Sequence, residues 1–152
     1  MRALLCHFRV RSGDGQWQAL ERTAPRCGRE RPLGRTTVPL GRPARVPAPP
    51  DGKSMVLARI DGIGVHGLER VRALAYRALT RHAVLDGNRR FRLVPGTAAD
   101  GLIMSVPPAA DFPDTLGLDQ GTRTLAVLRG EDEQPDDKVT IRWSAVPIRA
   151  AK

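Results

Sequence analysis

Apolar and polar residues follow regular patterns mainly in the second part of the chain. Residues 55–60, Met-Val-Leu-Ala-Arg-Ile, form an apolar run that is typical of a buried strand. After a glycine-rich turn at 61–67, apolar residues recur at helical spacing over residues 68–82, which predicts an amphipathic helix of about four turns. The turn residues Asp-Gly-Asn at 86–88 are expected to end that helix.

Shorter strands are expected after the helix. Residues 91–94 and 102–106 are strand candidates, and residues 95–101 between them predict the loop of a hairpin. Residues 114–137 are ambiguous, because glycines interrupt a leucine pattern that would otherwise favour a helix. Residues 139–146 alternate between apolar and polar types, as a half-buried strand does.

This order of elements predicts an α/β chain of the α+β kind, an incomplete ferredoxin-like sandwich with a mainly antiparallel sheet and one clear amphipathic helix. Residues 51–152 carry the pattern and form the predicted domain. Residues 1–50 hold seven of the 13 prolines and ten arginines, and a hairpin around residues 12–15 is the sole regular element expected there. We therefore predict that residues 1–50 are a disordered arm.

The excess positive charge lies mostly in this arm. The chain carries 25 Lys and Arg against 16 Asp and Glu, a net charge of +9, and residues 1–50 hold ten arginines against three acids. One hypothesis is therefore a small basic protein that binds RNA or DNA through residues 1–50. The arm contains no recognition motif, so such binding is expected to be non-specific.

Other classes of protein gain no support. No apolar run approaches the ~18–20 residues that span a bilayer, and the first ten residues are too polar for a signal peptide. Cys6 and Cys27 match no zinc or redox spacing. We therefore predict reduced thiols, a cytoplasmic location and no membrane partner. His82 is expected on the apolar side of the helix, and Trp143 in the core or on an edge strand.

Two aspartates are the candidates for chemistry. Asp61 follows the strand at 55–60, and Asp100 lies in the loop of the predicted hairpin. A strand beside that hairpin would bring both carboxylates to one edge of the sheet, where they could bind Mg²⁺ or Mn²⁺. Asp-Gly occurs five times in the chain, and an ordinary turn is the alternative interpretation.

Three segments occur in a suggestive order. They are the strand and Asp-Gly-Ile-Gly turn at 55–64, the helix rich in Arg, Ala and Leu at 68–79, and Ala-Asp-Gly followed by apolar residues and Pro-Pro at 99–108. Together they resemble the first half of a class III nucleotidyl cyclase catalytic domain, most of all cyclase-like domains of actinobacterial signalling proteins. The resemblance covers about residues 54–147.

The resemblance implies that Asp61 and Asp100 hold divalent metal, Mg²⁺ or Mn²⁺. It also implies that the backbone of Gly62, Ile63 and Gly64 approaches the phosphates of a nucleoside triphosphate. An active member would be a nucleotide cyclase, a phosphorus–oxygen lyase, that works as a homodimer or with a larger signalling partner.

The residues that family members use for base recognition and transition-state stabilisation have no match in the chain. We therefore expect a truncated or degenerate cyclase-like module that binds metal and nucleotide with little or no cyclase activity alone. A diguanylate-cyclase-like remnant is a further alternative, although residues 97–101 lack the glycine- and acid-rich loop of that family.

Overall fold

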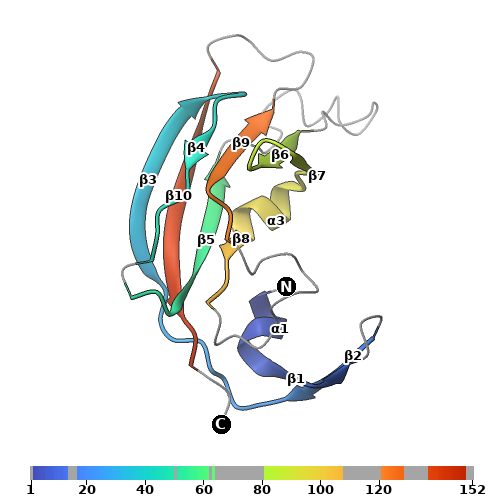
Figure 1. Ribbon diagram of the computed structural model, residues 1–152. Helices are drawn as coiled ribbons and strands as arrows, with labels where there is room; N and C mark the ends of the chain where they lie inside the picture. Colours follow the sequence, from blue (N-terminus) through green and yellow to red (C-terminus); the bar gives the residue numbers. More distant parts are fainter. Residues whose placement is uncertain are drawn as a thin grey trace.

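The computed structural model describes residues 2–13, 17–49, 51–61, 63, 81–107, 121–128 and 137–149. In chain order these residues form α1 (Arg2–His7), β1 (Phe8–Gly13), β2 (Gln18–Arg22), β3 (Arg31–Pro39), β4 (Ala44–Arg45), β5 (Ser54–Asp61), β6 (His82–Leu85), β7 (Arg89–Arg92), α3 (Pro95–Asp100), β8 (Leu102–Ser105), β9 (Thr124–Leu128) and β10 (Lys138–Pro147). The described part of the chain is mainly antiparallel sheet with few helices, which confirms the α+β class (Figure 1).

Two four-stranded sheets pack against each other. The first sheet has the strand order β3-β10-β5-β8, and the second has the order β4-β9-β6-β7. Val56 and Ile141 of the first sheet share one buried apolar cluster with Ala83, Leu125 and Val127 of the second. Burial of this cluster removes apolar surface from water and stabilises the sandwich.

The two strongest strand predictions are confirmed. The run 55–60 lies in β5, where Met55 and Ala58 are fully buried. Residues 139–146 lie in β10, which ends at Pro147, because proline cannot donate a further ladder hydrogen bond. Trp143 is buried in the shared core, as expected.

Residues 1–50 are not a disordered arm, and the prediction is wrong on this point. They contain α1 and β1 to β4, and β3 pairs with β10 from Pro39 opposite Lys138 to Arg31 opposite Ala145. The prolines of β3 do not exclude a strand here, because β3 is the edge strand of its sheet and an edge strand tolerates a missing N–H. The first sheet therefore combines strands from both halves of the sequence.

The hairpin predicted from 91–94 and 102–106 is also wrong. β7 pairs with β6 in the second sheet, whereas β8 pairs with β5 in the first. The intervening residues form α3, which starts with proline, a residue that the first turn of a helix accepts. Gly101, with φ +108°, ends the helix, and Ala98 is buried in the core between the sheets.

The Asp-Gly-Asn turn is confirmed, but it joins two strands. Asp86 and Gly87 have φ of +50° and +77°, as in the tight turns that connect hairpins, and they link β6 to β7. His82 begins β6 and is therefore not a helical residue. Most of the predicted helix at 68–82 lies outside the described residues. β9 falls within the ambiguous stretch 114–137.

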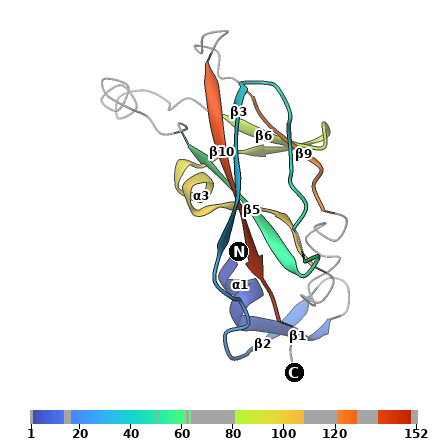
Figure 2. The ribbon, with the colours of Figure 1, turned by 90° about the vertical axis from the view of Figure 1, so that its left-hand side faces the viewer.

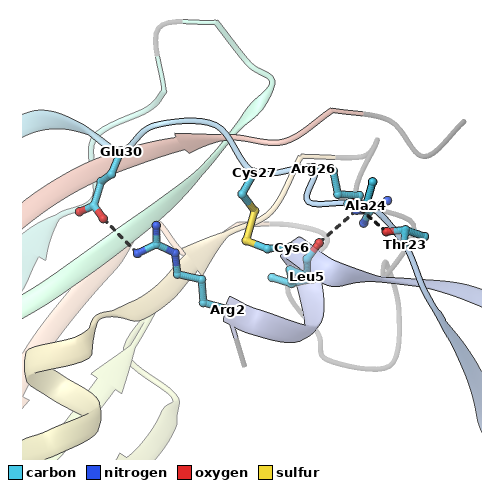
Figure 3. Close-up of a disulfide and its surroundings, with 8 residues drawn as sticks. All are labelled: Arg2, Leu5, Cys6, Thr23, Ala24, Arg26, Cys27 and Glu30. Carbon is cyan, nitrogen blue, oxygen red and sulfur yellow. Dashed lines mark hydrogen bonds and ion pairs between the residues drawn. A yellow bond between two sulfur atoms is a disulfide. The ribbon is translucent and has the colours of Figure 1, made fainter.

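Cys6 and Cys27 form a disulfide, so the prediction of reduced thiols is wrong (Figure 3). The Arg26 amide donates to the Cys6 carbonyl at 3.0 Å, and the Thr23 amide donates to the His7 carbonyl at 2.8 Å. These contacts bring the two cysteine Cα atoms to 5.1 Å, within the range that a disulfide spans. The spacing of the two cysteines along the chain did not predict the disulfide, because backbone hydrogen bonds between distant residues bring the cysteines together.

The N-terminal segment covers one end of the first sheet. Leu5 and Cys6 pack with Met55, Leu57 and Val146 in a second buried cluster, on the face of β5 and β10 that points away from the other sheet. Figures 1 and 2 show α1 and the β1–β2 hairpin at this end. None of the described helices is long and apolar enough to cross a membrane.

The disulfide should contribute strongly to stability. Its cysteines are separated by 21 positions, and closing a loop of this size is worth about 3 kcal/mol in the chain-entropy account. We expect Cys6→Ser/Cys27→Ser to lower the free energy of unfolding in urea by about that amount, and dithiothreitol to do the same to the unmodified protein. The reductant should leave the double variant unchanged. Free thiols in the unfolded, unreduced protein would contradict the assignment.

Candidate functional site

Three arginines lie in line across the first sheet. Arg35 of β3 is directly opposite Arg142 of β10, and Arg142 is directly opposite Arg59 of β5. We call these three residues the arginine row. Side chains at opposed positions of antiparallel strands lie close together, so neighbouring positive charges repel. Such an arrangement requires compensating anions.

Asp61 compensates Arg142. Arg142 Nε donates to Asp61 Oδ2 at 2.6 Å, and Arg142 Nη2 donates to Asp61 Oδ1 at 2.7 Å. This two-pronged contact matches the planar fork of the guanidinium to both carboxylate oxygens. It raises the pKa of Arg142, while the nearby charge of Arg59 opposes the rise. Both side chains stay about half exposed, at 56% and 43%.

Glu30 compensates Arg59. Arg59 donates from Nη1 to Glu30 Oε1 and from Nη2 to Oε2, the latter at 2.9 Å. Arg2 of α1 donates to the same carboxylate at 3.0 Å, as Figure 3 shows. The hydrogen bonds from Arg59 lower the pKa of Glu30 to about 2, although partial burial acts in the opposite direction. Glu30 is therefore ionised at neutral pH.

A groove of about 490 Å³ runs beside the arginine row. All three arginines line it, together with Glu30 and Ser144. The pairing of β3 with β10 shifts register between Trp143 and Ser144, which marks a β-bulge at this point.

Gly34 lies at this bulge and also lines the groove. Its φ of +137° is strained for any residue with a Cβ, and the space beside it is open. The groove is thus lined by the backbone of Gly34 and by the three side chains of the arginine row.

A second pocket lies on the other side of Arg59. It has a volume of about 800 Å³, and its lining includes Arg2, the disulfide cysteines and Asp100. Arg59 lines both spaces, whereas Glu30 lines the groove but not the second pocket. The position of the Arg59 side chain therefore affects the shape of both spaces.

The predicted metal ligands lie at the end of β5 and in the helix that precedes β8. Asp61 is the last residue of β5, and Asp100 closes α3 just before β8, which runs antiparallel to β5. Their contacts differ. Asp61 binds Arg142. The pKa of Arg59 is raised mainly by its hydrogen bond to Glu30, and the charge of Asp100 adds to that rise. Within the described residues, the two carboxylates share no hydrogen-bonding partner.

The predicted phosphate-binding turn is described at one position. The Ile63 side chain is buried in the core between the sheets, so only its backbone could approach a ligand. Gly62 and Gly64 lie outside the described residues.

A divalent metal does not fit Asp61 in this arrangement. Both carboxylate oxygens already accept hydrogen bonds from Arg142, and a metal would have to displace that guanidinium. Arg59, the opposite neighbour of Arg142, would add further repulsion. No group of three His, Cys, Asp or Glu that could hold a metal occurs among the described residues. The local charge favours an anion over a cation.

The arginine row was not found from the sequence. Its members lie far apart in the chain, and Arg35 belongs to a segment predicted to be disordered. A partial signal was present, because Arg59 interrupts the apolar run of β5 and Arg142 occupies a polar position of the alternating strand β10. Only the register of the strands shows that these positions are neighbours.

No protein-family model, curated protein or solved structure matches this chain.

The Glu30–Arg59 pair should give the protein a defined acid sensitivity. The pKa of Glu30 is about 2 in the folded protein against an ordinary value of 4.5, so the ion pair stabilises the fold above pH 4.5. That stability is lost as the pH falls through about 2. We expect Glu30→Gln to lower the free energy of unfolding at pH 7 by on the order of 2 to 3 kcal/mol, and the difference from wild type to shrink in acid.

Glu21→Gln is the matched control. Glu21 also accepts hydrogen bonds from arginines, Arg9 and Arg11, but it does so on the exposed β1–β2 hairpin. Exposed ion pairs contribute little to stability. We therefore expect a small change in the urea midpoint for Glu21→Gln. An equally small change for Glu30→Gln at pH 7 would contradict the assignment.

Proposed function

We propose that the protein binds phosphate groups in the groove beside the arginine row. The observation that supports the proposal is the row itself, in which three guanidinium groups occupy opposed positions on adjacent strands. Carboxylates compensate Arg142 and Arg59. Within the described part of the chain, no carboxylate forms a salt bridge with Arg35. A phosphate, which accepts two hydrogen bonds from one guanidinium, would supply the missing anion.

The net charge supports the same proposal. The chain has a net charge of +9, and ten of its 25 Lys and Arg residues lie in residues 1–50 against three acids. Because β3 belongs to the first sheet, much of the charge once assigned to a disordered arm lies on folded structure. A basic surface on a folded domain is the feature that favours a polyanionic partner.

Two sources of phosphate share this chemistry. One is the backbone of RNA or DNA, which residues of the N-terminal segment, including Arg35, would bind without sequence preference. The other is a nucleoside triphosphate, as the resemblance to nucleotidyl cyclases suggests. In both cases Asp61 and Glu30 act as positioning residues, because they hold Arg142 and Arg59 at the groove.

Substitution of Arg35 tests the groove directly. We expect Arg35→Gln to weaken binding of a fluorescent triphosphate and of a labelled oligonucleotide, each by roughly tenfold at low salt. For the oligonucleotide, the slope of log affinity against log salt should fall by about one, since one phosphate contact is lost. Fluorescence anisotropy over a salt series measures both quantities.

Arg42→Gln provides the control for charge alone. Arg42 is exposed after β3 and does not line the groove, so its removal changes net charge equally. Equal losses in the two variants would show that the groove has no special role. A loss with the oligonucleotide alone identifies nucleic acid as the source of phosphate, and a loss with the triphosphate alone identifies a nucleotide.

Metal-dependent nucleotide binding is the second candidate function. It is favoured by the pairing of β5 with β8, since Asp61 ends one strand and Asp100 comes shortly before the other. On this proposal the chain is a degenerate cyclase-like module, and its first sheet is part of an incomplete ferredoxin-like sandwich. Bound Mg²⁺ or Mn²⁺ would supply charge neutralisation for the triphosphate. Arg142 would first have to leave Asp61.

Calorimetry distinguishes the two candidates. If Asp61 and Asp100 hold metal, triphosphate binding should require Mn²⁺ or Mg²⁺, and Asp61→Asn or Asp100→Asn should abolish the dependence. If the arginine row alone binds phosphate, binding should persist in the presence of a chelator. Metal-independent binding in wild type would exclude the second candidate.

The cytoplasmic location predicted from the sequence stays a prediction. The Cys6–Cys27 disulfide weighs against it, because disulfides persist mainly in oxidising compartments.

A further inference from the structure

We infer that the β7 side of the second sheet, its outer edge among the described strands, binds single-stranded nucleic acid. The surface consists of Arg90, Phe91 and Arg92 of β7, and we call it the β7 edge. β7 is the outermost strand in the order β4-β9-β6-β7. The groove lies on the first sheet, so this inference concerns a different surface and holds whether or not the groove binds phosphate.

Phe91 is exposed where an aromatic ring would normally be buried. It lies opposite Ala83, which belongs to the core between the sheets, yet 52% of the Phe91 surface is exposed. Leu93, two positions later, is buried in that core. The ring of Phe91 therefore lies at the rim of the sandwich, where a flat partner can reach it.

The charges beside Phe91 are not neutralised by carboxylates in the described part of the chain. Arg90 Nη2 donates to His82 Nδ1 at 3.0 Å, and this hydrogen bond supplies no negative charge to offset the arginine. Arg92, directly opposite His82, is also exposed. Arg89, in contrast, forms a salt bridge with Asp86 at 3.2 Å, next to the turn. The hairpin thus has one compensated arginine near its turn. Arg90 and Arg92, which have no carboxylate partner among the described residues, flank Phe91 along β7 and project from the other face of the strand.

This combination fits the chemistry of a single strand. Exposed aromatic rings stack on bases without strong sequence preference. A single strand that runs along this outer edge could stack a base on Phe91 from one face while its phosphates reach Arg90 and Arg92 on the other. In a duplex the faces of the bases are already stacked on one another, so Phe91 could not use them. The β7 edge should therefore prefer single-stranded to double-stranded nucleic acid of the same length.

Fluorescence anisotropy of the full chain with labelled oligo-dT of about 12 nucleotides tests the inference. We expect Phe91→Ala to weaken binding roughly tenfold, and Phe91→Trp to retain most of it, because indole also stacks. The double variant Arg90→Gln/Arg92→Gln should lower the salt slope by about two. Val94→Ala is the matched control, since Val94 is 53% exposed just beyond β7 but offers no ring.

Three results would overturn the inference. They are equal binding by Phe91→Ala and wild type, an equal loss in Val94→Ala, and binding of a duplex of the same length as tightly as the single strand. Thermal unfolding by circular dichroism excludes misfolding of the variants. Arg35→Gln separates the two proposals, because it should leave the ratio of affinities between wild type and Phe91→Ala unchanged even if the groove contributes to binding.

Discussion

The structure depends on the double pairing of β10. This strand is hydrogen-bonded to β3 on one side and to β5 on the other, so it joins the N-terminal segment to the rest of the first sheet. Its alternation sends Ile141 and Trp143 into the core between the sheets and Arg142 to the opposite face. One strand thus sets both the packing of the sandwich and the alignment of the arginine row.

The same alignment places like charges beside one another, and the fold tolerates them through specific anions. Asp61 and Glu30 each hold a guanidinium by two hydrogen bonds, and Glu30 also binds Arg2 of α1. The first sheet is therefore connected electrostatically to the helix that covers its end. Carboxylates of the protein neutralise Arg142 and Arg59, and a bound anion could neutralise Arg35 in the same way. The ion pairs that stabilise the first sheet and the groove proposed to bind phosphate therefore share the same arginines.

The sequence revealed what is encoded locally. β5 and β10 were predictable because their own residues alternate or run apolar, and the turn at 86–88 was predictable from Asp-Gly-Asn. Three features were not predictable from the sequence: β3, α3 and the disulfide. β3 and the disulfide depend on partners distant in sequence, and prolines in β3 and at the start of α3 favoured irregular structure. For the candidate site, the sequence drew attention to Asp61 and Asp100, whose role as metal ligands stays a prediction. The arginines near them became evident only from the strand register.

The contacts of β10 also constrain how the chain reaches its native state. Thr36 and Trp143 are hydrogen-bonded across 107 positions, and Ile148 bridges to Cys27 beside the disulfide. During synthesis β3 therefore cannot pair with β10 until almost all of the described sequence has been made. Contacts of such long range slow folding and leave a strand edge open in the meantime. Arg31 and Arg35 of β3 are exposed, and their positive charge opposes edge-to-edge pairing of this strand with another chain.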